Sequence, residues 1–273
     1  MKKNRSLLIF PILMLLFAGC LQIETTLTVN KDGSGNINEK VLFSKTFVNM
    51  LKDFAQAFQD STSTEEFTMF SEEEIIANAQ DYGENVVYDS YKKIDNEDWE
   101  GYQVIYSFDD ITKIKISPDP DSKVNMGDEA TTAENVQEEE YYFFKFVKGD
   151  TPQLIIDRPA IELNEETSES NDSSDTEQND EEAGDEFVKM MEGMKIDMAI
   201  EVKGQIINTN ATYVQGSRVT LFQMDFSEMM KNKEGFEEFK RNEPKNIDEM
   251  KTYLEKLPGI KIEVEKPVTI NFK

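Results

Sequence analysis

The sequence predicts an α+β fold: a mostly antiparallel sheet with helices packed on one face. Short runs of alternating apolar and polar residues recur along the chain, which is the pattern of half-buried strands. Glycine-containing turn signals separate several of these runs at hairpin spacing. Helical stripes occur apart from the strands and do not alternate with them, so a parallel βαβ arrangement is not expected.

The first elements are a hairpin and a helix. Gln22–Asn30 and Ile37–Phe43 alternate as strands, and Lys31–Gly35 between them has turn chemistry. Ser44 can cap a helix in which apolar residues recur at helical spacing. These residues are Phe47, Met50, Leu51, Phe54 and Phe58. A capping box at Ser71–Glu74 predicts a second, shorter helix.

Later segments complete the predicted sheet. Expected strands, each rich in β-branched or aromatic residues, are Val86–Lys92, Tyr102–Phe108, Ile111–Ile116, Tyr141–Val147, Leu154–Asp157, Ile196–Ile206, Val219–Phe226, Ile260–Val264 and Val268–Phe272. Expected helices are Phe187–Met194, Glu234–Arg241 and Ile247–Leu257, the last capped by Asn246. Pro118–Glu140 is expected to be a long loop.

An acidic segment divides the chain. Residues Glu162–Glu186 contain twelve acidic residues and no lysine or arginine, so they cannot bury enough apolar surface to offset the cost of ordering. We expect a disordered insert at 162–186 between an N-terminal part, 20–161, and a C-terminal part, 187–273, of one domain. We also expect the two parts to form one sheet, since each part alone offers few strands; the alternative is two domains.

The amino terminus has the pattern of a signal peptide, residues 1–19. Lys2, Lys3 and Arg5 precede an apolar run, Leu7–Gly19, that is too short to span a bilayer. The run ends at Cys20, the chain's single cysteine. The sequence Leu-Phe-Ala-Gly-Cys resembles the lipobox of bacterial lipoproteins, which implies lipidation of Cys20, with palmitate among the acyl chains. The alternative is an ordinary secretory signal.

The lipobox resemblance also implies a location. Leu21 follows Cys20, and by analogy with sorting in two-membrane bacteria this residue favours the outer membrane over inner-membrane retention. We expect a protein anchored in the bacterial cell envelope through the lipid on Cys20 and facing the periplasm. A host with a single membrane would place it on the outer leaflet of that membrane.

Composition excludes several classes of function. The 273 residues include 29 basic and 55 acidic ones, a net charge of −26, whereas a nucleic-acid-binding protein needs a basic surface. Histidine is absent, so the usual general base and the commonest transition-metal ligand are missing. One cysteine cannot form a disulfide framework. We therefore expect no enzyme, no cofactor, no metal site and no nucleic-acid partner.

Three segments together resemble a loose group of bacterial envelope lipoproteins that includes the mycobacterial LppM-type domain. They are the strand–turn–strand around Asp32–Gly35, directly after Cys20, then Gly204–Ala211, and Val214–Thr220. The resemblance implies a mixed α/β envelope lipoprotein that handles lipid or glycolipid.

Two local patterns have competing interpretations. Asn30–Ile37 imitates the start of an EF-hand loop, but the twelfth position is Val41 where calcium needs a bidentate acid, so a plain hairpin turn is favoured. Ser34 has no histidine to act as its base, so no catalytic role is expected. The late cluster of methionines is better explained by core filling than by a groove for lipid or a partner. Its members are Met190, Met191, Met194, Met229 and Met230.

The functional hypothesis is a non-enzymatic binding module on a lipid anchor, with lipid or another amphiphile as ligand. The alternative is a structural or protein-interaction lipoprotein of envelope assembly, which would hold no small molecule and could contact an envelope protein near Glu234–Leu257.

Overall fold

The computed structural model describes residues 21–58, 70–119, 141–159, 193–232, 234–235 and 246–273, and side chains in this range except those of residues 54–58. The signal peptide and Cys20, the acidic insert at 162–186, most of the loop at 118–140 and most of the helices expected at 187–194 and 234–241 lie outside these residues.

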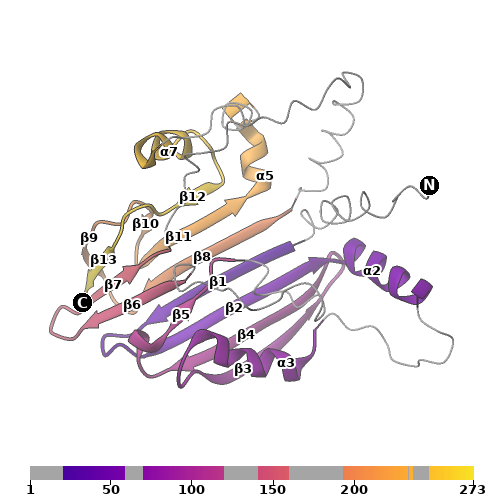
Figure 1. Cartoon of the computed structure of the whole chain (residues 1–273), viewed down its shortest axis with the longest axis horizontal. Helices are drawn as coiled ribbons and strands as arrows, with labels where there is room; N and C mark the ends of the chain where they lie inside the picture. The colour runs from indigo at the N-terminus through magenta and orange to yellow at the C-terminus, as the bar shows by residue number, and fades with distance from the viewer. Residues whose placement is uncertain (1–20, 59–69, 120–140, 160–192, 233, 236–245) are drawn as a thin grey trace, which may run out of the picture.

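A large mixed sheet forms the body of the molecule (Figure 1). Its strands, in spatial order, are β10 (Val214–Gln215), β11 (Arg218–Asp225), β8 (Lys195–Val202), β1 (Leu21–Val29), β2 (Gly35–Ser44), β4 (Trp99–Phe108) and β3 (Val87–Asp95), with β12 (Ile260–Ile262) also paired to β11. Neighbours are antiparallel except β1 and β8, which run parallel from Gln22 opposite Lys195 to Val29 opposite Val202. The expectation of a mostly antiparallel sheet is therefore confirmed apart from this central pair.

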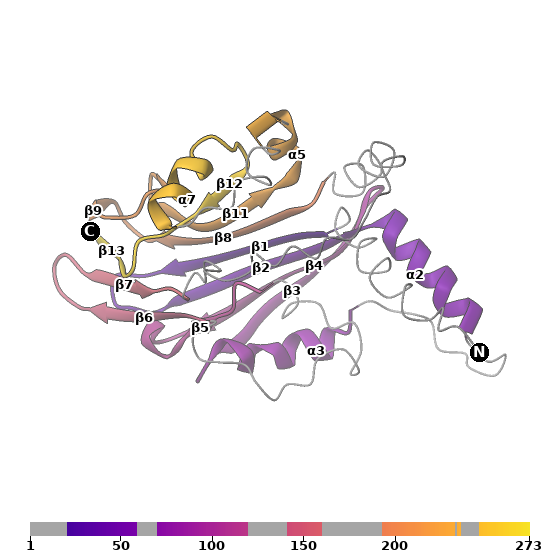
Figure 2. The same cartoon turned by 45° about the horizontal axis from the view of Figure 1, so that its top comes forward.

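A second, five-stranded sheet lies across one face of the large one (Figures 1 and 2). Its antiparallel order is β5 (Lys115–Ile116), β6 (Tyr142–Val147), β7 (Gln153–Asp157), β13 (Val268–Phe272) and β9 (Ile206–Thr209). The expectation of a single sheet is wrong. The strand expected at Ile196–Ile206 ends at Val202, and β9 then joins the other sheet. Gly204 lies between them because a Cβ there would come within 2.3 Å of the Lys273 carbonyl oxygen.

Few helices accompany the sheets. They are α2 (Lys45–Phe58), α3 (Glu72–Ala77), η3 (Asn78–Tyr82), η4 (Ile111–Lys113), α5 (Phe226–Met229), η7 (Met230–Asn232) and α7 (Ile247–Leu254). In the two views α2 projects from one end of the large sheet, and α5 and α7 lie on the side of β11 and β12 (Figures 1 and 2). The face expected to carry helices thus carries mainly the second sheet. Within the described residues no helix is long and apolar enough to cross a membrane.

The core lies between the two sheets. The inward alternate residues of both sheets form one apolar cluster, which includes Leu27, Ile37, Tyr106, Leu154 and Phe272. Ser71 caps α3 as its sequence predicts, and Ile75 of that helix joins the same cluster. The strand expected at Ile111–Ile116 is instead η4 followed by the short β5, because the Asp110 carboxylate accepts a hydrogen bond from the Thr112 N–H and starts a helical turn.

Candidate functional site

The lipidation site that the sequence predicts, Cys20, lies outside the described residues, but its neighbour is placed. Leu21 is the first residue of β1, in the middle of the large sheet, and pairs with Phe43 of β2. A lipid on Cys20 would therefore be joined to the sheet with no linker, since adjacent Cα atoms are about 3.8 Å apart. Leu21, Phe43 and Trp99 lie at the same end of neighbouring strands in the large sheet. We call this end of the sheet the anchor end.

The EF-hand-like segment is a hairpin turn. The Asp32 carboxylate accepts hydrogen bonds from the Ser34 N–H and hydroxyl, at 3.0 and 2.7 Å, and Gly33 adopts φ of 89°. Val41, at the position where calcium would need an acid, is fully buried in β2. Among the described residues no group of three or more acidic, cysteine or histidine side chains could hold a metal ion.

The described methionines of the predicted stripe mainly fill a second, smaller core. Met194 and Met229 are buried with Phe226, Leu254, Leu257 and Ile260, and Met230 packs against this cluster half-buried. Met190 and Met191 lie outside the described residues. The core interpretation of these methionines therefore agrees with the packing of Met194 and Met229.

One row of inward-facing residues crosses the large sheet near its middle. Phe222, Met198, Thr25, Glu39 and Val104 lie opposite one another on β11, β8, β1, β2 and β4 in turn. Thr25 and Glu39 are direct cross-strand partners, and both are buried. On the β8 side of this pair the row is apolar, with Met198 and Phe222, whereas on β2 it is polar at Glu39. An apolar surface and a polar surface therefore lie next to each other.

A mainly apolar cleft lies over the β8 side of the row. Its lining is mainly apolar: Ile23, Thr25, Ile196, Asp197, Met198 and Phe222 on the large sheet, together with Ser117–Asp119. The free volume is about 20 Å³. This is room for about one water molecule, so the cleft as it stands is too small for an alkyl chain.

A polar cavity lies over the β2 side of the row, at Glu39. It holds about 130 Å³ and is lined by Glu39, Asn78, Asp81, Tyr82, Lys115, Ser117 and Tyr141. The Lys115 ammonium lies 4.5 Å from the centre of the Tyr141 ring, a cation–π contact. Ser117 lines both the cavity and the cleft, so the two spaces adjoin at this residue.

Two tyrosines hold the Glu39 carboxylate. The Tyr82 hydroxyl donates to one of its oxygens, and the Tyr102 hydroxyl donates to the other at 3.1 Å. Burial, followed by the nearby Glu39 charge, raises the pKa of both tyrosines well above the ordinary range. Both phenols therefore stay protonated and remain donors at any physiological pH.

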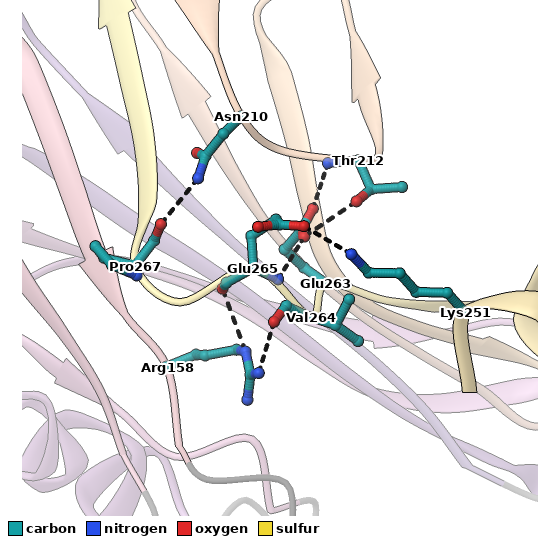
Figure 3. A network of polar contacts seen from close by, with 8 residues as sticks. All are labelled: Arg158, Asn210, Thr212, Lys251, Glu263, Val264, Glu265 and Pro267. Atoms are coloured by element: carbon teal, nitrogen blue, oxygen red, sulfur yellow. Dashed lines mark hydrogen bonds and ion pairs between the residues drawn. The ribbon is translucent and has the colours of Figure 1, made fainter. Parts of the chain in front are cut away.

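A separate polar network surrounds the segment between β12 and β13 (Figure 3). Arg158, buried at the end of β7, donates to the carbonyl oxygens of Val264 at 2.6 Å and Glu265 at 3.2 Å. The buried Glu263 carboxylate accepts from the Thr212 N–H at 2.6 Å, and Lys251 pairs with Glu265 at 2.8 Å. These contacts join four segments that are far apart in the sequence, so we assign the network to the fold.

Comparison with known proteins gives one structural likeness. No protein-family model matches the chain, and no curated protein matches its sequence. The chain is similar to the folded domain of the Mycobacterium tuberculosis LppM protein, solved by NMR, over 100% of this chain and 96% of that one. The identity is 8% and the TM-score 0.33. At that score the likeness carries no argument, and the motif resemblance seen in the sequence stays a prediction.

Sequence reasoning missed the paired cavity and cleft. Glu39 stands among the apolar inward positions of its strand, a signal that marks a buried polar residue. Its partners Tyr82 and Tyr102 are 43 and 63 residues away, and nothing in local spacing identifies them.

Proposed function

We propose that this chain is a non-enzymatic lipoprotein of the bacterial cell envelope, anchored through a lipid on Cys20 in the outer membrane and facing the periplasm, whose body binds an amphiphile between its two sheets. The observation that carries the binding proposal is that a polar cavity and an apolar cleft adjoin at Ser117, over the Thr25–Glu39 pair. An amphiphile needs this combination: polar groups for its head beside apolar side chains for its tail.

The lining indicates the class of head group. Two carboxylates, Glu39 and Asp81, face one ammonium, Lys115, together with hydroxyl and amide groups. A small amine- or hydroxyl-bearing head suits this lining better than an anionic one, because an anion would meet the two carboxylates. The tail would lie over Ile23 and Ile196, towards the anchor end. Since the cleft has room for only about one water molecule, binding requires Ser117–Asp119 to move off the sheet.

The test uses the chain from Cys20 to Lys273 with dodecylamine, dodecanoate and dodecyl maltoside as probes, followed by native mass spectrometry and thermal shift. We expect one bound dodecylamine or maltoside per chain, with dodecanoate binding about tenfold more weakly, a difference of about 1.4 kcal/mol. Ser117→Trp should abolish binding, because the indole fills the junction of the two spaces. Ser107→Trp, at a half-buried position on the opposite face of the large sheet, should bind normally.

Equal binding by both tryptophan variants, or no binding of any probe to the parent chain, would show that this proposal is wrong. Glu39→Gln adds a finer test, since it should remove the preference for dodecylamine over dodecanoate while retaining the binding of dodecyl maltoside.

A different observation favours the alternative, a protein-interaction lipoprotein. Phe143 and Val147 of β6 are 39% and 53% exposed on the outer face of the small sheet, and Ile247 of α7, within Glu234–Leu257, is 37% exposed. Photo-crosslinkers placed in cells at Phe143 and at Ile247 should then capture one and the same envelope protein. Capture of many proteins in proportion to their abundance would count against this function.

A further inference from the structure

Helix α2 begins at the anchor end. Phe43 pairs with Leu21, Ser44 pairs with Trp99, and α2 starts at the next residue, Lys45. The Lys45 N–H donates to the Asp98 carbonyl oxygen at 2.8 Å. The start of the helix and the chain's single tryptophan, Trp99, thus lie beside the residue that follows Cys20.

The first two turns of α2 fix its direction. Phe47 and Val48 are buried, and the Phe47 ring stacks on Phe43 with centroids 5.5 Å apart. On the polar side Lys45 pairs with Asp95 at 2.6 Å and Lys52 with Glu100 at 3.4 Å. The whole 14-residue helix is about 21 Å long, and the part after these turns projects from the end of the sheet (Figure 2).

The amphipathic pattern continues along this projecting part. Phe47 and Leu51 pack against the core, whereas Met50 is 38% exposed. By helical spacing in the sequence, Phe54 and Phe58 continue this apolar stripe. The helix carries two lysines and one aspartate, in a chain whose net charge is −26. It therefore avoids the charge repulsion that the rest of the surface would meet at an anionic bilayer.

We infer that α2 is a second membrane contact: the part of its apolar stripe that lies beyond the sheet, from Met50 to Phe58, lies in the interface of the bilayer that holds the Cys20 lipid, with Trp99 at the level of the head groups. Tryptophan is enriched at that level because its ring is apolar and its N–H is polar. One lipid-anchored residue and one amphipathic helix at the same end of a rigid body would fix the orientation of the sheets relative to the membrane. This inference rests on the proposed anchoring at Cys20.

The test attaches the chain from Cys20, which contains every described residue, through its single cysteine to a maleimide lipid in phosphatidylcholine vesicles. Brominated lipids in the same vesicles quench tryptophan only at short range, so Trp99 reports contact. We expect strong quenching in the parent chain, and about tenfold weaker partition of the untethered chain on Met50→Glu. Met50→Phe should keep or strengthen the partition.

Val147→Glu is the matched control, because it adds the same charge at an exposed apolar position on the small sheet. It should leave quenching and partition unchanged. Absence of quenching in the tethered parent, or equal loss from both glutamate variants, would overturn the inference. Because the tether is chemical, these results do not depend on lipidation in cells. That is tested by palmitate labelling of the full chain, which Cys20→Ala should abolish, and failure there would remove the anchor proposal instead.

Discussion

Glu39 occupies a position at which the alternation of its strand calls for an apolar side chain. Ile37, Val41 and Phe43 on the same face are all buried in the core. A buried carboxylate is tolerated only when its oxygens are satisfied, and here two tyrosine hydroxyls do so. The sequence could show that Glu39 is out of pattern. It could not show the tyrosines, because strand pairing and a distant helix bring them there.

Buried tyrosines should also make the free energy of unfolding fall at alkaline pH, and Tyr142 is the clearest case. Burial raises the pKa of Tyr142 to about 12, against about 10 in the unfolded chain. Between these values the unfolded state releases a proton that the folded state keeps. The stabilisation is therefore complete below pH about 10 and is lost as pH rises to about 12.

Tyr142→Phe should make the fall in unfolding free energy between pH 10 and pH 12 shallower, by the equivalent of one proton. Urea titrations at several pH values measure this slope. Phe144→Leu, a non-ionising change two residues along the same strand, should lower stability at every pH and leave the slope unchanged. An unaltered slope in Tyr142→Phe would contradict the assignment.

At the scale of elements, local patterns predicted the hairpin well and the connections poorly. The β1–β2 pair has the expected strands and turn because its signals lie within a few residues. The β8–β9 break was missed, since Ile206 continues the alternation of β8 although it belongs to the other sheet. A side chain at Gly204, in the break, would meet the Lys273 carbonyl oxygen, and no local pattern records that contact.

The segment from Glu263 to Pro267 depends on one side chain from another element. Arg158 donates three hydrogen bonds, to the carbonyl oxygens of Pro159, Val264 and Glu265. Arg158→Lys keeps the charge but replaces the planar fork with a single ammonium, which cannot reach all three oxygens. We expect a loss of about 2 kcal/mol in unfolding free energy, because buried carbonyls lose charge-assisted hydrogen bonds.

Urea denaturation measures this loss. Lys231→Met, which removes an exposed ion pair with Glu228, is the comparison and should cost less than about 1 kcal/mol. Equal costs for the two variants would mean that the arginine network contributes no more than a surface pair.

At the scale of the whole molecule, the central pairing of β1 with β8 joins segments more than 160 residues apart in the sequence. The acidic segment 162–186 lies between them along the chain, and both sheets contain strands from before and after it. Composition could not predict the parallel pairing, which depends on tertiary packing. It favoured one sheet, whereas the structure has two, each with strands from both parts.

The net charge of −26 should govern how salt affects this fold. Like charges repel more in the compact state than in the expanded unfolded chain. The screening length falls from about 30 Å at 10 mM salt to about 8 Å at 150 mM, so added salt relieves this repulsion. Salt also weakens half-exposed pairs such as Lys45–Asp95 and Lys251–Glu265, each worth no more than about 1 kcal/mol.

We expect the repulsion to dominate, so the melting temperature should rise when NaCl increases from about 10 mM to about 500 mM. Sodium chloride is preferred to sulfate because sulfate also strengthens apolar burial. Replacing the twelve acidic residues of 162–186 by their amides removes twelve negative charges and changes no residue of the strands of either sheet. That variant should melt higher at low salt and respond less to NaCl. If its response equalled that of the parent, the repulsion would have to arise among charges on the sheets themselves, and a melting temperature that fell with salt would mean that the ion pairs dominate.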